Sequence, residues 1–280
     1  MSGSGKALSA ELVHSLVATG LADPERLAAW GADPAQLAQL GVPPEAVDVE
    51  ALRDFAGLSV KIRHNGCRGH LPRTFRLLAC SGLELAFFRD YTAAFFARQR
   101  RGLKAISDRL DGIAEHAEAW CRAEAPEPAA RRLIRDIVLH ERTLARFRSR
   151  ARPVEAEPPE APAPLSLASV PVLRGTVEVH VLSCHPAQVD KVLAQREPDL
   201  GAIERGARTV VYHLRDTGSV RTIEVEPGVG HVLAGVDGRR SIGEMAGEVL
   251  GDAALGPALV ALVRQLVELE LVGVAAAEVR

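Results

Sequence analysis

Hydrophobic and polar residues alternate most clearly near the C-terminus, over residues 207–271. The segments Thr209–Leu214 and Val220–Val225 are rich in β-branched and aromatic residues, with polar residues between them. Asp216-Thr217-Gly218 lies between the two segments, and its glycine can adopt the positive φ that tight turns need. This pattern predicts a β-hairpin. The segment Thr176–Leu182 also alternates, and we expect it to join the sheet of the hairpin.

Beyond the hairpin the apolar spacing becomes helical. An apolar stretch follows Pro227 and stops at Asp237-Gly238, and Ser241 with Glu244 has the spacing of a capping box. Gly256-Pro257 then begins a third helix, whose apolar residues are three and four positions apart: Leu259, Leu262, Val263, Leu266 and Leu269. The predicted order, a β-hairpin followed by three helices, is that of a winged-helix-like module.

This order of elements resembles the PqqD-like fold, the RiPP recognition element that captures the leader of a ribosomally made peptide. The resemblance rests on the hairpin, on the Asp237-Gly238-Arg239 turn before Ser241-Ile242, and on the Leu266–Val272 ending. In that family the leader adds as a strand to the hairpin edge and packs against the last helix. The resemblance implies a leader-binding site made of Val220, Arg221, Thr222, Ile223, Glu224, Val225, Leu259, Leu262, Val263 and Leu266. An ordinary winged-helix subdomain with an exposed or covered edge is the alternative.

The first half of the chain has the pattern of helices. In residues 1–58, Asp-Pro and Pro-Pro pairs and glycines recur about every ten residues around single apolar positions. This pattern predicts a run of short helices. Asp residues would cap their starts, and Gly31 and Gly41 would end two of them. Residues 59–152 predict a helical bundle. Its last helix, 131–150, carries an apolar stripe formed by Leu133, Ile134, Ile137, Val138, Leu144 and Phe147.

Charge divides the chain into blocks. Residues 1–60 carry 3 basic and 8 acidic side chains, residues 61–152 carry 20 and 10, and residues 153–280 carry 11 and 18. Within the basic block, a predicted helix junction gathers polar donors at Arg63, Asn65, Arg68, Arg73 and Arg76. Arginine suits carboxylate or phosphate partners, so these residues predict a surface that docks a partner or positions a peptide. The alternative is helix capping and plain surface charge within the chain.

A second resemblance covers residues 58–275. The segment from Ile62 to Leu78, the helix around 83–91 and the later LIRDIVLHERTLARF helix look like the helical part of MbnC- and HvfC-like proteins. These are partner subunits of multinuclear non-haem iron oxidases that modify cysteines in ribosomal peptides. The resemblance implies that the iron lies in a separate oxidase, while this chain binds the precursor leader and forms a heterodimer with the enzyme. The first 58 residues have no counterpart in that family.

Other sites find little support in the sequence. Cys67-x-x-His70 has a metal-like spacing, but no second local pair completes the three or four ligands that zinc needs. The residue that would complete a zincin helix after His140-Glu141 is Leu144, and no glycine-rich phosphate loop is present. We therefore expect no catalytic residues, no metal ligands and no cofactor in this chain.

The remaining composition bears on setting and organisation. No secretory signal or span of ~20 apolar residues is evident, and the four cysteines are widely spaced, so we expect a cytoplasmic protein without a membrane partner. Five prolines and three glutamates in residues 153–164 predict an extended linker. The predicted domains are 1–58, a short-helix region; 59–152, a basic helical bundle; 153–165, the linker; and 166–280, the leader-binding domain.

The sequence thus predicts an α+β protein with an N-terminal helical bundle and a C-terminal winged-helix-like module. The function it favours is that of a non-catalytic partner of a peptide-modifying iron oxidase. One alternative is a winged-helix DNA-binding regulator, which would use the basic bundle. Against it, the third predicted helix of the C-terminal module carries Arg264 opposite Glu268 and Glu270, so we expect no nucleic-acid partner. An independent enzyme is the other alternative, and it would need a ligand set that the sequence does not offer.

Overall fold

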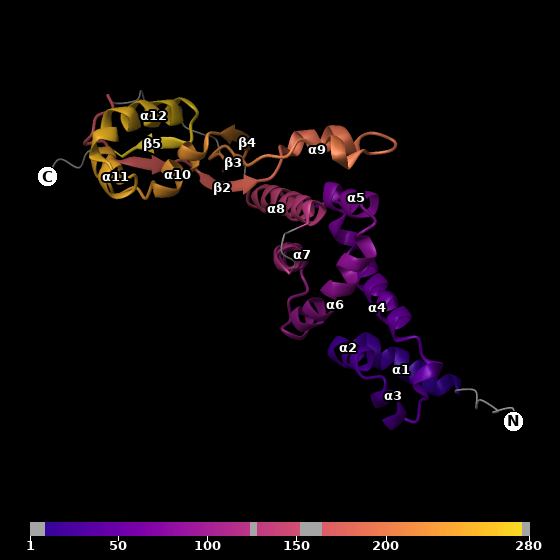
Figure 1. The fold of residues 1–280 in the computed structure, drawn as a ribbon. Coiled ribbons are helices and arrows are strands. Elements are labelled where there is room, and N and C mark those ends of the chain that lie inside the picture. The colour runs from indigo at the N-terminus through magenta and orange to yellow at the C-terminus, as the bar shows by residue number, and fades with distance from the viewer. Residues whose placement is uncertain (1–8, 124–127, 152–163, 276–280) are drawn as a thin grey trace, which may run out of the picture. The chain divides into compact units, whose positions relative to one another are not determined.

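The structure is a computed structural model that describes residues 9–123, 128–151 and 164–275. It confirms the α+β class, with helices in the N-terminal part and a small antiparallel sheet followed by helices in the C-terminal part (Figure 1). The chain divides into two compact units. One holds residues 1–142 and 190–200, and the other holds 143–189 and 201–280. Most of the predicted linker, residues 153–163, lies outside the described residues.

The first unit begins with short capped helices. They are α1 (Ala10–Ala22), α2 (Pro24–Ala32), α3 (Ala35–Gln39) and the 3-10 turn η1 (Pro44–Ala46), followed by α4 (Val49–Arg63). The carboxylate of Asp23 accepts a hydrogen bond from the Arg26 amide at 3.1 Å, and that of Asp48 accepts one from the Ala51 amide at 2.9 Å. Gly41 ends α3 with a φ of 75°, as predicted. The prediction for Gly31 was wrong, because α2 continues to Ala32 and the amide of Asp33 makes its last backbone hydrogen bond, to the carbonyl of Ala29.

The predicted boundary at residue 58 falls inside α4. This helix is continuous from Val49 to Arg63, and its Ala56 lies in the same core as Leu16, Leu27 and Trp30 of α1 and α2. Residues 1–58 and the start of the predicted bundle therefore belong to one unit. A turn signal marked the earlier helix ends, whereas Gly57 before the predicted boundary lies buried inside α4 and does not end it.

The rest of the first unit is a helical bundle. It contains η2 (Asn65–Cys67), α5 (Pro72–Cys80), α6 (Glu84–Arg100), α7 (Ile106–Arg122) and α8 (Ala129–Arg150), whose last residues belong to the second unit. Helices α4 and α6 cross so closely that a Cβ on Gly57 would lie 2.8 Å from backbone atoms of Arg89. The predicted stripe of α8 is buried apart from the half-buried Leu144. On α6, Phe87, Tyr91 and Phe95 are buried, whereas Ala94 is exposed.

The second unit contains the predicted hairpin. Strands β3 (Arg208–Leu214) and β4 (Val220–Val225) pair antiparallel, and Gly218 in the turn has a φ of 79°. Strand β2 (Thr176–Leu182) joins them as predicted, so the sheet order is β2-β3-β4. A separate two-stranded sheet pairs β1 (Pro171–Leu173) with β5 (Val272–Val274).

Helices flank these strands, and β3 is buried on both of its faces. Before the hairpin lie α9 (Pro186–Leu193) and η3 (Leu200–Ala202), and the last residues of α9 belong to the first unit. After the hairpin come α10 (Pro227–Gly235), α11 (Ile242–Glu248), η4 (Ala253–Leu255) and α12 (Gly256–Glu268). The core of the unit joins the three main helices after the hairpin to Val211 of β3 and Val272 of β5. Gly230 of α10 lies so close to the sheet that an added Cβ would come within 2.7 Å of Thr209 Cγ2. The predicted order of hairpin and three helices is therefore present.

Candidate functional site

Strand β4 is an edge of the three-stranded sheet. It pairs with β3 and with no other strand among the described residues. The amide of Arg215 donates to the carbonyl of Ser219 at 2.9 Å, which makes this a hydrogen-bonded pair of the hairpin. Because such pairs alternate along an antiparallel ladder, Arg221, Ile223 and Val225 also bond to β3. The amides and carbonyls at positions 220, 222 and 224 consequently point away from β3, along the open edge.

The two sets of β4 side chains lie on opposite faces of the sheet. Ile223 and Val225 are half-buried and pack against the core formed with α10, α11 and α12. Thr222 and Glu224 are exposed on the other face. An added strand would therefore meet an apolar surface on one face and a polar surface on the other.

The predicted contact surface on α12 is mostly internal. Leu259, Val263 and Leu266 are 3%, 0% and 1% exposed, and all three belong to the core. Only Leu262 of the predicted set remains half-buried. The helical spacing correctly located the apolar stripe of α12, but this stripe packs against α11 and the strands and leaves no surface for a peptide at those three residues.

Arg221 is engaged within the chain. Its guanidinium donates to the carbonyl of Leu269 and lies 3.8 Å from the carboxylate of Glu270. Arg215 pairs with the same carboxylate. Glu270 itself has a φ of 59°, the left-handed region that non-glycine residues rarely adopt. These contacts tie the start of β4 to the C-terminal end of α12.

The other end of β4 carries a second charged group. Arg208 donates to the carboxylate of Glu224 at 3.1 Å, and the His185 Nε2 lies 3.5 Å from it. Both ends of the edge strand are therefore anchored by ion pairs across neighbouring elements, and this holds the open edge in a fixed position.

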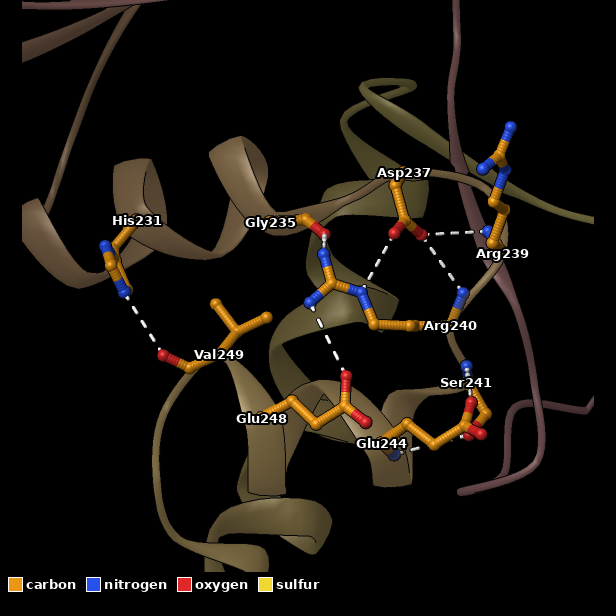
Figure 2. A network of polar contacts seen from close by, with 9 residues as sticks. All are labelled: His231, Gly235, Asp237, Arg239, Arg240, Ser241, Glu244, Glu248 and Val249. Carbon is orange, nitrogen blue, oxygen red and sulfur yellow. Dashed lines mark hydrogen bonds and ion pairs between the residues drawn. The ribbon is translucent and has the colours of Figure 1, made fainter.

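The turn Asp237-Gly238-Arg239, on which the first resemblance partly rests, connects α10 to α11 and is held by hydrogen bonds. Figure 2 shows the Asp237 carboxylate accepting from the amides of Arg239 and Arg240 at 2.9 and 3.0 Å, and from Arg240 Nε at 2.9 Å. These hydrogen bonds lower the pKa of Asp237 to about 2. The predicted capping box is confirmed, since Ser241 and Glu244 exchange side-chain to backbone hydrogen bonds. The turn positions the helices and leaves its polar groups satisfied.

Two residues of the predicted arginine cluster are used inside the first unit. Arg73 makes a two-pronged contact with Asp190, with its Nη2 2.8 Å from Oδ2. Arg76 donates to the carbonyl of Gln195 at 2.9 Å. Both arginines thus hold the segment 190–200 within the unit. For these two residues the structure shows contacts within the chain, which was the alternative to a docking surface.

Glu141 organises the same region, and the sequence reasoning missed its role. The helix α5 has no side-chain cap of its own at Leu71. Glu141 of α8 supplies one, because its carboxylate accepts from the amides of Arg73 and Thr74, both at 2.9 Å, and from the Thr74 hydroxyl at 2.8 Å. No local spacing could reveal this contact, since 67 residues separate Thr74 from Glu141.

The other three residues of the cluster lie at the surface. Arg63, Asn65 and Arg68 are all exposed around the turn η2. The Arg68 guanidinium lies 4.9 Å from the ring centroid of Phe75 and its Nε donates to Asn65 at 3.2 Å. Arg63 lies over the rings of Phe95 and Phe96 at about 6 Å. The guanidiniums of Arg63 and Arg68 are exposed at this surface, and that of Arg68 also lies 3.4 Å from Glu84.

Two histidines lie inside the bundle. His64 is fully buried and donates from Nδ1 to the Val60 carbonyl at 2.7 Å, while its Nε2 has no hydrogen-bond partner. His116 Nε2 is likewise buried without a partner. Burial lowers the pKa of each histidine from 6.5 to about 4. Cys67 is buried whereas His70 is exposed, so the Cys-x-x-His spacing does not converge.

Within the described ranges, no three His, Cys, Asp or Glu side chains are arranged to hold a metal ion. None of the described helices combines the length and the apolar character that crossing a membrane requires. In comparisons with known proteins, no family model matches the chain. No curated protein matches it either.

Proposed function

We propose that this chain is a non-catalytic partner protein that binds the leader of a ribosomal precursor peptide and docks with an iron-dependent oxidase that modifies the cysteines of the core peptide. The observation that carries the proposal is the open edge of β4. Three residues there, 220, 222 and 224, direct backbone donors and acceptors outward. An unpaired strand edge is a template for a further strand.

The leader would bind by extending the sheet beyond β3 and β4. Its backbone would pair with Val220, Thr222 and Glu224. Its alternate side chains would meet Ile223 and Val225 on one face and the exposed polar residues on the other. Leu262 is the member of the predicted α12 set that retains surface for such a contact.

Binding the leader would assist the oxidase through proximity. A short flexible connection between leader and core keeps the core at an effective concentration of ~mM near the enzyme. Iron would belong to the oxidase, and this chain would supply recognition. We place this activity in the cytoplasm, where the four cysteines of the chain would stay reduced.

A proline substitution at the open edge tests the proposal. Thr222→Pro removes an outward amide and leaves the ladder to β3 intact, since Thr222 does not bond to β3. We expect the affinity for a ribosomal precursor peptide to fall by about tenfold or more, measured by fluorescence anisotropy with the labelled peptide. Thr222→Ala separates the loss of the side chain from the loss of the amide.

The opposite edge of the sheet provides the matched control. In β2, the amide of Val181 points away from β3, and its side chain is 63% exposed. Val181→Pro should leave the affinity unchanged. Unchanged precursor binding by a folded Thr222→Pro protein would refute the assignment of the leader to β4. A loss of binding in Val181→Pro alone would move the leader to the β2 edge.

A further inference from the structure

Helix α4 carries an apolar face that its own unit does not use. Phe55, Leu58 and Ile62 are 47%, 40% and 57% exposed. Their spacing of three and four residues puts them on one side of the helix. Leu85 of α6, 41% exposed, joins Phe55 and Leu58 in lining a pocket of about 420 Å³. We call these four residues the α4–α6 patch.

The core of the unit does not require these side chains. A different face of α4, with Ala56, Gly57 and Val60, is buried, and Gly57 lies directly against the backbone of α6. The patch is therefore a second apolar stripe on the same helix. Single exposed apolar residues are common, but a contiguous group around a pocket with a polar rim is typical of a protein-binding surface.

The rim of the patch is positively charged at one end. Lys61 donates to Glu84 at 2.6 Å, and Arg68 lies 3.4 Å from the same carboxylate. Glu84 is 17% exposed, whereas Arg68 is 50% exposed. Two cations, Lys61 and Arg68, thus contact a single carboxylate, and the exposed Arg63 follows Ile62 at the end of α4.

The opposite end of the rim is more acidic. Arg89 lies 3.5 Å from carboxylates of both Glu50 and Asp54, and 3.8 Å from that of Asp90. Arg53 pairs with Glu50 at 2.7 Å. Two cations there face three anions, so the charge of the rim is asymmetric along α4. A complementary partner would place apolar side chains on the patch and a carboxylate toward Arg63 and Arg68.

We propose that the α4–α6 patch docks the oxidase partner, through a face of that enzyme that carries apolar side chains flanked by acidic residues. This inference rests on the proposed function, because it names the surface by which the chain would hold its enzyme. It also changes the predicted docking surface. Arg63 and Arg68 stay in it as the rim, while Arg73 and Arg76 are occupied by Asp190 and Gln195.

The test is binding of full-length variants to a purified multinuclear iron oxidase, measured by isothermal titration calorimetry. Phe55→Asp places a charge in the centre of the patch, and we expect it to weaken the complex by about 30-fold or more. Leu40→Asp is the matched control, since Leu40 is 45% exposed but lies at the end of α3, outside the patch. It should bind as the wild type does.

Charge reversal tests the rim separately. Arg63→Glu with Arg68→Glu should slow association and remove most of its salt dependence, because rim charges act mainly on the rate of encounter. Precursor binding at β4 should be unchanged in every patch variant.

Three results would overturn the inference. A wild-type complex that Phe55→Asp does not weaken would leave the proposed function standing and remove the patch from it. A wild-type dimer in sedimentation that Phe55→Asp dissociates would assign the patch to a second copy of this chain. No complex between the wild type and the oxidase would refute both the patch and the partner role, even where precursor binding persists.

Discussion

Removing the carboxylate of Glu141 should destabilise the first unit strongly. In Glu141→Ala, the amides of Arg73 and Thr74 and the Thr74 hydroxyl lose their shared acceptor. Glu141 is 2% exposed, so water would not readily replace it. A hydrogen bond to a charged group contributes ~1.5–3 kcal/mol. Glu141 also lies 3.6 Å from the guanidinium of Arg73, and loss of one partner of a buried ion pair costs ~3–5 kcal/mol. Burial disfavours the charged carboxylate and raises the pKa of Glu141. This offsets part of the stabilisation that its contacts provide. We expect a loss of about 3 kcal/mol.

Tryptophan fluorescence measures this loss in the first unit alone. Both tryptophans of the chain, Trp30 and Trp120, lie in that unit, and both are buried. With a urea dependence of ~2 kcal/mol/M for a unit of this size, the midpoint should fall by about 1.5 M. Glu115→Ala is the matched control. Its carboxylate is 65% exposed in an ion pair with Arg98, and such pairs contribute ~0–1 kcal/mol. Equal midpoints for the two variants would refute the trans-capping role of Glu141.

Two further stability predictions follow from the first unit and one from the second. The pKa values of His64 and His116 fall from 6.5 to about 4 on folding, so the unfolded chain binds more protons between those values. The free energy of unfolding should therefore be highest above pH ~6.5. It should fall as the pH drops toward 4, by ~3 kcal/mol per histidine. Urea titrations at several pH values should show a weaker pH dependence for His64→Gln. Gly57→Ala should destabilise by ~1–3 kcal/mol in the same fluorescence assay, because its Cβ would meet the backbone of α6 at 2.8 Å. Gly247→Ala in α11 should stabilise by up to ~1 kcal/mol in calorimetry, since nothing lies within 4 Å of the added Cβ. A gain for Gly57→Ala, or a loss for Gly247→Ala, would contradict the packing described for these helices.

Local signals in the sequence predicted the second unit well. The hairpin followed from β-branched residues around a turn with Gly218, and α11 began at the Ser241–Glu244 capping box. Each of these features depends on residues a few positions apart, where side-chain chemistry dictates backbone conformation directly. The strand at Thr176–Leu182 joined the sheet for the same reason, since its alternation suits a half-buried strand.

Predictions that depended on distant contacts were less complete. The spacing along α12 showed which face is apolar, but not that α11 and the strands cover Leu259 and Val263. Arginines at a helix junction suggested a docking surface, yet Arg73 meets Asp190, which lies 117 residues later. The α4–α6 patch was missed for the converse reason. Phe55 and Leu58 have core-like spacing, and only burial shows that they remain at the surface.

The most direct test of the leader-binding claim is amide hydrogen exchange of the full chain with and without the precursor peptide, read at single residues by NMR. A strand added to β4 should slow the exchange of the outward amides of Val220, Thr222 and Glu224, and leave that of Val177, Val179 and Val181 on the β2 edge unchanged. Precursor binding without slower exchange at Thr222 and Glu224 would contradict the account.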